Sequence, residues 1–253
     1  MVFEQLFLVG LAVIAGYFVF TGGRQLTTVF HILRNDPLPI RELHGHRGPV
    51  EIEGQATEGE GGTVTAPFTG SSCLAYTYEV EERNGKSWRT LDEGMGGTDF
   101  VVDDGTGRVR VDPTGAEVHL ESHSVGVPAG SELPDRLAAY VDSTAAVDPP
   151  DKSVDLLLTE VTVGKQQRFT ERRLDGGETV YVYGEASRGP ATDWGSSLVD
   201  ALIGTGDRTP VFVISDTDER GTAWRIARGS VLELGFGLVL FVAVVGTLFD
   251  GSF

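Results

Sequence analysis

The chain has 253 residues, and its 37 acidic against 20 basic side chains give it a formal charge of −17. Such an acidic chain lacks the excess of Lys and Arg that a nucleic-acid backbone requires, so no nucleic-acid partner is expected. The single cysteine, Cys73, excludes an intramolecular disulfide and a zinc site built on several thiolates. Hydrophobic residues make up 40%, which is enough for a folded core.

Two apolar stretches near the ends of the chain predict membrane-spanning helices. Residues 6–20 and 234–249 contain no charged side chain, and with their flanks they approach the roughly 20 residues that a span needs. A cleaved signal peptide is the alternative for the first stretch, but no Lys or Arg precedes it. A buried core helix is the alternative for the second, which is apolar all round and therefore fits lipid better.

We therefore expect transmembrane helices at residues 2–20 and 231–249, with the lipid bilayer as a partner. Glu233, an acid at the start of the second helix, is expected to reach the headgroup zone. Basic residues next to the spans favour a cytoplasmic middle region, because both short tails lack Lys and Arg. The sequence thus predicts a two-pass integral protein of the cell membrane. The arginines in question are Arg24, Arg34, Arg41, Arg220, Arg225 and Arg228.

The acidic surplus is spread along the chain, and Lys is rare, with only Lys86, Lys152 and Lys165. An Asp-rich surface poor in Lys is typical of halophilic proteins, in which concentrated salt screens the self-repulsion. The alternative is a surface that attracts a cationic partner. We expect a halophilic protein, because a partner site would form a patch and not cover the whole surface.

Between the two apolar stretches, the sequence predicts a mainly β domain over residues 24–230, barrel- or sandwich-like with a few short helices. Apolar and polar residues alternate in short runs, and glycine-rich turns separate them. The expected hairpin turns lie at Asn84-Gly85, at 103–107 and at 175–177. The expected strands are 50–53, 75–80, 100–102, 109–111, 156–163, 168–174, 179–183 and 211–214, the expected helices are 25–34, 132–141, 193–203 and 222–228, and a linker is expected at 145–152.

Residues 48–56 and 177–186 share the order strand, Gly, polar residue, Ala. This similarity indicates either two related halves of a barrel or two ordinary strands that end at glycine.

Several blocks of sequence together resemble the GIDE domain, also called the beside-a-membrane domain, of mitochondrial membrane E3 ubiquitin ligases. The order of the blocks and the two flanking apolar stretches carry the resemblance, and the composition looks like that of a haloarchaeal member of the family. The blocks are Pro39–Leu43 with Gly48–Gly54, Thr65–Gly70 with Cys73–Tyr76, Phe100–Gly107 with Val111–Ala116, and Arg172–Gly184 with Phe212–Asp216.

The resemblance implies RING-type ubiquitin transfer, but the residues for it are missing. A RING finger binds two zinc ions through eight Cys or His ligands. This sequence has one Cys and five His, and none of them follows Phe249. We therefore expect a member of the family that lacks the RING finger, and we leave open whether the chain is an enzyme.

The other candidate residues each have a structural interpretation that we favour. Cys73 is a candidate nucleophile, but a lone Cys before Leu-Ala-Tyr is more often a buried hydrophobe. His44 with His46, and His119 with His123, are candidate zinc or nickel ligands without a helical pattern around them. Asp103, Asp104 and Asp112 are candidate calcium ligands, and Gly105 and Gly107 are superficially similar to a phosphate loop, but a hairpin turn explains this segment better. We predict no catalytic, cofactor-binding or metal-binding residue and no cofactor.

The sequence thus predicts a membrane-anchored binding or scaffold protein without a catalytic site of its own. The alternative is a component of a membrane-tethered ubiquitin-like conjugation system that acts with a separate catalytic subunit. A third interpretation, an accessory to a transporter or channel, requires oligomerisation. The protein partner is unknown, and homo-oligomerisation is left open.

Overall fold

The structure is a computed structural model. It describes residues 10–11, 13–14, 16–18, 20, 37–150, 153–156, 159–162, 164–189, 197–209, 211–216 and 239. The chain divides into two compact units, one formed by Leu38–Asp216 and the other by Met1–Pro37 with Thr217–Phe253. The first of these, here called the central unit, contains the strands. The predicted division at residues 2–20, 24–230 and 231–249 stays a prediction.

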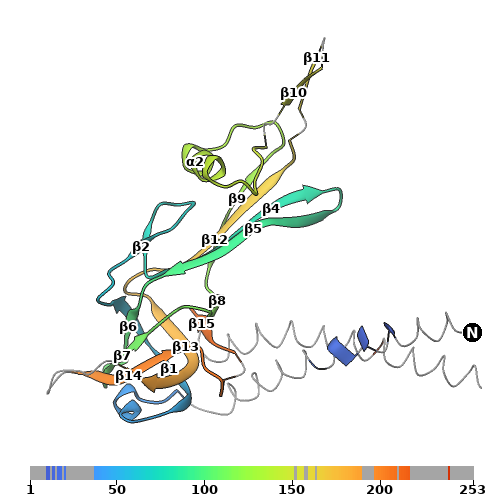
Figure 1. Cartoon of the computed structure of the whole chain (residues 1–253). Coiled ribbons are helices and arrows are strands. Elements are labelled where there is room, and N and C mark those ends of the chain that lie inside the picture. Colours follow the sequence, from blue (N-terminus) through green and yellow to red (C-terminus); the bar gives the residue numbers. More distant parts are fainter. Residues whose placement is uncertain are drawn as a thin grey trace, which may run out of the picture. The chain divides into compact units, whose positions relative to one another are not determined.

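The described strands include a closed barrel, seen at the lower left of Figure 1. Around it, β1 pairs with β6, β6 with β7, β7 with β14, β14 with β13, and β13 again with β1. The β7–β14 pair is parallel and the others are antiparallel. The expected mainly β, barrel-like fold is therefore confirmed. The barrel strands are β1 (Gly48–Glu58), β6 (Phe100–Asp103), β7 (Arg108–Val111), β13 (Thr179–Arg188) and β14 (Leu198–Gly204).

Alternate side chains of the barrel strands point inward and form its apolar core. Ile52, Val109 and Ile203 come from different strands and are fully buried in one apolar cluster, because every second residue of a strand points to the same face. The short 3₁₀ helix η1 (Ile40–Leu43) adds Ile40 and Leu43 to this cluster. Two further strands extend the barrel sheet from β13: β15 (Val213–Ser215) pairs with β13, and β8 (Glu117–His119) pairs with β15.

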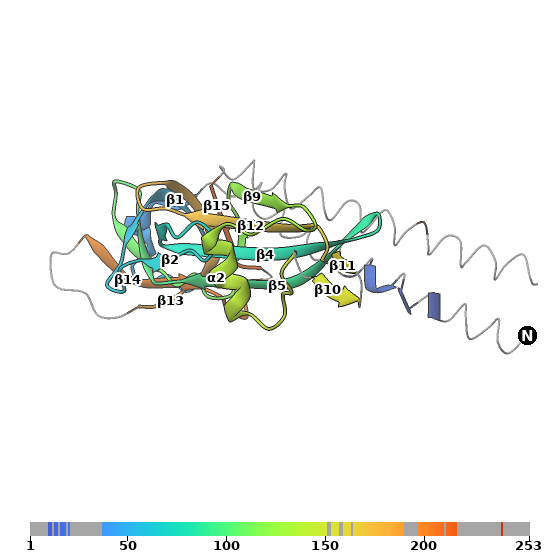
Figure 2. The same ribbon diagram turned by 90° about the horizontal axis from the view of Figure 1, so that it is seen from above.

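A second sheet projects from the barrel, with its strands in the order β5, β4, β12, β9, all antiparallel (Figure 1). Its strands are β4 (Ala75–Asn84), β5 (Ser87–Gly97), β9 (Ser122–Val127) and β12 (Gln167–Leu174). The helix α2 (Asp135–Ser143) covers one face, as the view from above in Figure 2 shows. Its Leu137 and Val141 join Val80, Phe169 and Phe68 in a second apolar cluster.

Two pairs of short strands complete the described part. β2 (Val64–Thr65) pairs with β3 (Ser72–Cys73), and the loop between them carries Phe68. β10 (Ser153–Leu156) pairs with β11 (Thr159–Thr162). The sequence predicted one strand over 156–163, which is wrong, because the chain reverses direction within that range.

Several expected elements are confirmed. Asn84 and Gly85 form the turn between β4 and β5, with Gly85 at a φ of 64°. The turn at 103–107 joins β6 to β7. The expected helix 132–141 is α2, which begins only after Pro134.

Three expectations are wrong. Strands 168–174 and 179–183 do not form a hairpin, because β12 belongs to the second sheet and β13 to the barrel. Residues 198–203 of the expected helix 193–203 lie in β14 instead, where Val199, Ala201 and Ile203 alternate as buried positions with a period of two. The expected linker at 145–152 is in part packed, since Val147 and Pro150 are buried.

The predicted localisation, a two-pass integral membrane protein, is contradicted. A spanning helix needs roughly 20 mostly apolar residues. Described positions between Gly10 and Phe20 are helical, but no helix of the described residues is long and apolar enough to cross a membrane. Most of residues 2–20 and 231–249, the expected helices 25–34 and 222–228, and Glu233 lie outside the described residues.

Candidate functional site

The helix-covered face of the second sheet carries three rows of cross-strand neighbours between β4 and β12. These rows are Tyr78 opposite Glu171, Val80 opposite Phe169, and Glu82 opposite Gln167. Residues two apart along a strand share a face, so the rows follow one another on the same side of the sheet. The middle row is apolar, and a buried polar residue lies at each end. Glu171 and Gln167 are each only 1% exposed, and Glu82 is 9% exposed.

At one end, the protein itself satisfies the Glu171 carboxylate. Its Oε2 accepts hydrogen bonds from the backbone N–H groups of Phe68 (2.8 Å) and Thr69 (3.2 Å). Its Oε1 accepts one from the Thr69 hydroxyl (2.6 Å) and forms an ion pair with Arg173 (3.4 Å). These bonds hold the loop between β2 and β3 against the sheet. Glu171 therefore has a structural role, since a buried carboxylate is stable only when it is hydrogen-bonded and paired.

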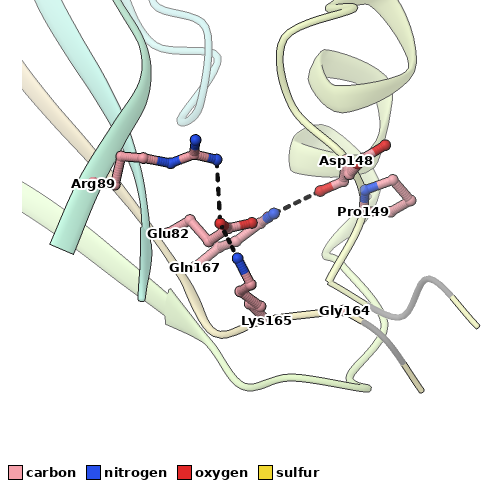
Figure 3. Close-up of a pocket in the computed structure, with 7 residues that line it drawn as sticks. All are labelled: Glu82, Arg89, Asp148, Pro149, Gly164, Lys165 and Gln167. Carbon is pink, nitrogen blue, oxygen red and sulfur yellow. Dashed lines mark hydrogen bonds and ion pairs between the residues drawn. The ribbon is translucent and has the colours of Figure 1, made fainter. Parts of the chain in front are cut away.

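At the other end, the sheet borders a cavity of about 250 Å³, here called the Gln167 cavity (Figure 3). Two cations meet on one oxygen of Glu82 there. Lys165 Nζ lies 2.8 Å from Glu82 Oε1, and Arg89 Nη2 lies 3.4 Å from the same atom. The cavity is lined by Glu82, Arg89, Asp148, Pro149, Gly164, Lys165 and Gln167.

The Gln167 side chain is only half satisfied. Its Nε2 donates to the backbone oxygen of Asp148, in the loop that follows α2 (Figure 3). That bond fixes the amide orientation, because a carbonyl oxygen only accepts. The other amide atom, Oε1, is buried and has no hydrogen-bond partner among the described residues. A buried acceptor without a partner costs about 1–3 kcal/mol, so its position beside a cavity indicates a place for a hydrogen-bond donor.

A second polar cavity, of about 310 Å³, lies next to Arg173. It differs from the Gln167 cavity because the hydrogen-bonding groups of Arg173 already have partners. Arg173 donates to both carboxylate oxygens of Asp175, at 3.2 Å each, and also to Thr69 and Glu171. These hydrogen bonds, first of all those to Asp175, raise the pKa of Arg173. Arg173 is therefore already bonded within the protein, and the Gln167 cavity is the stronger candidate for a ligand site.

Cys73 lies where a structural thiol is expected. Its side chain is fully buried, and its Sγ donates to the backbone oxygen of Val64 at 3.7 Å. Burial, with the negative charge of Asp175, raises the pKa of the thiol to about 11. Since the thiolate is the nucleophile, the thiol is poorly reactive at neutral pH.

The histidine pairs are not arranged as metal sites. His119 lies in β8 of the barrel sheet and His123 in β9 of the second sheet, so the helical i, i+4 geometry is absent from this described segment. His44 Nδ1 lies 3.3 Å from Asp200 Oδ1, and hydrogen bonding from His44 lowers the pKa of Asp200. Within the described ranges, no group of three or more His, Cys, Asp or Glu side chains is placed to hold a metal ion.

The aspartates around Gly105 use their oxygens within their own turns. Asp103 accepts from Gly105 N–H at 2.8 Å, and Asp112 accepts from Thr114 N–H at 2.9 Å. Asp104 accepts from Ile40 N–H at 2.8 Å, which ties η1 to the barrel. Although burial opposes it, hydrogen bonds from Ile40 and Thr106 lower the pKa of Asp104. The expected hairpin turn is thus what these residues build.

Comparison with known proteins finds a family model that matches part of the chain. Residues 75–193 match the family model GIDE, described as "E3 Ubiquitin ligase". This segment is similar to GIDE domains. The resemblance drawn from the sequence is therefore confirmed over these residues. No curated protein and no solved structure matched the chain.

The GIDE segment contains the second sheet, α2 and every residue that lines the Gln167 cavity. Sequence reasoning did not find this site. The sequence of the strand Gln167–Leu174 did indicate it, because Gln167 and Glu171 lie two residues before and after the apolar Phe169 and therefore share its face of the sheet. Polar residues on the buried face of a strand indicate either a structural hydrogen-bond network or a binding site. The partner strand β4 repeats the pattern, with Glu82 on the same face as Val80.

Proposed function

We propose that this chain is a binding module of the GIDE family that has no catalytic chemistry of its own and holds a partner at the Gln167 cavity. The observation that carries the proposal is the state of Cys73. A ligase that forms a thioester with its modifier needs a reactive cysteine, exposed and in an electropositive setting. Cys73 is buried, and its pKa is raised to about 11.

The composition of the sequence supports the same proposal. A RING finger needs eight Cys or His ligands for its two zinc ions. The printed sequence offers one Cys and five His, so its own residues are too few for that site. The binding part of the proposal rests on the half-satisfied Gln167 beside two cationic side chains.

The family description favours a second candidate, a component of a ubiquitin-like conjugation system that acts with a separate catalytic subunit. In that case the chain binds a modifier, a carrier enzyme or a substrate, and another protein supplies the zinc-organised or thiol chemistry. Both candidates place a binding function, and no bond-making step, in this chain.

A reconstituted conjugation assay tests the proposal. The purified chain is mixed with a matched modifier, activating enzyme and carrier enzyme, with and without a separate RING subunit. We expect no conjugation that depends on this chain when the RING subunit is absent. Conjugation that requires the chain alone, and that is lost in Cys73→Ser, would overturn the proposal and make Cys73 a nucleophile. A stimulation seen only with the RING subunit supports the second candidate.

A further inference from the structure

The Gln167 cavity has a hydrogen-bond acceptor, Gln167 Oε1, and it also has two donor residues, Arg89 and Lys165, with N–H groups available for a ligand. A guanidinium carries five N–H groups and an ammonium three, and one bond from each to Glu82 accounts for part of that capacity. Arg89 and Lys165 have side chains that are 63% and 47% exposed, so both can turn toward a ligand. A fitting ligand therefore offers an N–H to Gln167 and oxygens to the two cations.

The arrangement of charge favours an anionic oxygen next to the two cations. The four charged residues of the lining, Glu82, Asp148, Arg89 and Lys165, sum to zero, but Glu82, Arg89 and Lys165 lie together and carry one net positive charge. The carboxylate of Asp148 points away from them in Figure 3, while its backbone oxygen faces Gln167. A cationic ligand would meet two like charges, and Glu82, the nearest carboxylate, is already paired with both of them. Charge-assisted bonds from Arg or Lys to a carboxylate are about twice as strong as neutral ones.

We propose that the Gln167 cavity binds a carboxylate that has an amide N–H on the neighbouring carbon, the chemistry of a peptide C-terminus or of a free acylated amino acid. Arg89 and Lys165 hold the carboxylate, and Gln167 Oε1 accepts the N–H. This inference rests on the proposed binding function and names its ligand. The size agrees, because about 250 Å³ accommodates a few small residues and not a folded surface.

At the opposite end of the same sheet face, the buried polar residue Glu171 has all of its hydrogen-bond partners within the protein. Glu171 is as deeply buried as Gln167, but the loop between β2 and β3 supplies its donors. The loop after α2 supplies Gln167 with an acceptor only. Because Oε1 is itself covered, side chains at the cavity must move before the ligand reaches it. Arg89 and Lys165 are exposed enough to turn toward the ligand's carboxylate as it enters.

The test measures binding of N-acetyl-glycyl-glycine to the full chain by calorimetry, in salt at which circular dichroism shows it folded. We expect the C-terminal amide of the same probe to bind at least 10-fold more weakly, because it lacks the carboxylate. An analogue in which an ester oxygen replaces the last N–H should also lose about 10-fold, because Gln167 Oε1 then lacks its donor. This last comparison leaves the protein unchanged and so avoids any folding defect of a Gln167 variant.

Protein variants supply the matched controls. Lys165→Gln and Arg89→Gln should each weaken binding at least 5-fold. Lys86→Gln, which removes the same charge from the exposed tip of the β4–β5 hairpin, should not. Longer acetylated peptides distinguish the source, since affinity that grows with length indicates a polypeptide C-terminus and constant affinity a free acylated amino acid.

Equal binding of acid and amide, no binding of either, or an equal loss with Lys86→Gln would overturn the inference that the ligand is a carboxylate with a neighbouring amide N–H. Such a result without conjugation by the chain alone removes the inference only. Conjugation that depends on Cys73 removes the proposed function instead.

Discussion

At the scale of single residues, burial decides what Cys73 can do. With a pKa of about 11 for the thiol, roughly one molecule in ten thousand carries a thiolate at pH 7. We expect iodoacetamide to leave Cys73 unmodified in the folded chain at pH 8 and to modify it fully in denaturant. In the folded chain the rate should rise toward pH 11, because only the deprotonated form reacts. Rapid modification at pH 8, measured by mass spectrometry, would contradict this assignment.

Glu171 is the residue whose loss should destabilise the central unit most directly. Glu171→Gln removes a buried charge that pairs with Arg173 and accepts from the Phe68 and Thr69 N–H groups. We expect a loss of roughly 3 kcal/mol in the free energy of unfolding, because these groups stay buried with weaker partners. Denaturant titration checks this, with Glu93→Gln as the control, since Glu93 is exposed. Equal stability of the two variants would show that the Glu171 network contributes little.

At the scale of elements, two glycines let the β4–β5 pair accommodate tyrosines. Tyr78 lies opposite Gly94 and Tyr76 opposite Gly96, and the tyrosine rings cover the glycines. A Cβ on Gly94 would lie 2.7 Å from Tyr78 ring atoms. Tyr78 has little room to move, because Phe68 and Tyr140 pack edge-on against it, with centroids 5.6 and 5.7 Å away.

Gly94→Ala should therefore destabilise the chain by about 1–3 kcal/mol through overpacking. Gly126→Ala is the matched control, since Gly126 lies in β9 of the same sheet, with nothing within 4 Å of the added Cβ. Thermal unfolding of both variants checks the prediction. A melting temperature as low for Gly126→Ala as for Gly94→Ala would mean that strand glycines matter here for another reason.

Elements and hairpins that follow local rules could be predicted from the sequence, but the pairing of strands that are distant in the sequence could not. Alternation located β1 and β13, and Asn84-Gly85 located a turn. The similar segments 48–56 and 177–186 prove to be neighbours, since Gly48–Gln55 pairs antiparallel with Thr179–Ala186. The turn at 175–177 was expected to make a hairpin, but the chain there leaves one sheet for the other, and no local pattern encodes such a change.

The same limit explains why the candidate site could not be predicted from the sequence. The Gln167 cavity joins Glu82 and Arg89 of one hairpin, Asp148 after α2, and Lys165 and Gln167 at the start of β12. No two of these segments form a recognisable motif. The burial of Cys73 agrees with the sequence-based interpretation of a lone cysteine as a buried hydrophobe. The expectation that no residue is catalytic or binds a metal stays a prediction.

At the scale of the whole molecule, the formal charge of −17 sets the dependence on salt. Two effects oppose each other as salt is added. Screening weakens pairs such as Arg89–Glu82, but exposed pairs contribute only about 0–1 kcal/mol each. Screening also relieves the repulsion among all the surplus carboxylates, and the Debye length falls from about 10 Å at 0.1 M to about 3 Å at 1 M. The second effect should dominate, because acids outnumber bases along the whole chain.

We therefore expect the melting temperature of the full chain to rise steadily between 0.05 and 2 M KCl, by ten degrees or so. Sorbitol at equal osmolality is the control, since it is excluded from protein surfaces but screens no charge. A variant with three exposed carboxylates neutralised, Glu53→Gln, Glu58→Gln and Glu93→Gln, should start from a higher melting temperature at low salt and gain less from KCl. A melting temperature that does not change with KCl, or that rises as much in sorbitol, would show that charge screening does not stabilise the chain. That result would favour the alternative, an acidic surface that attracts a cationic partner.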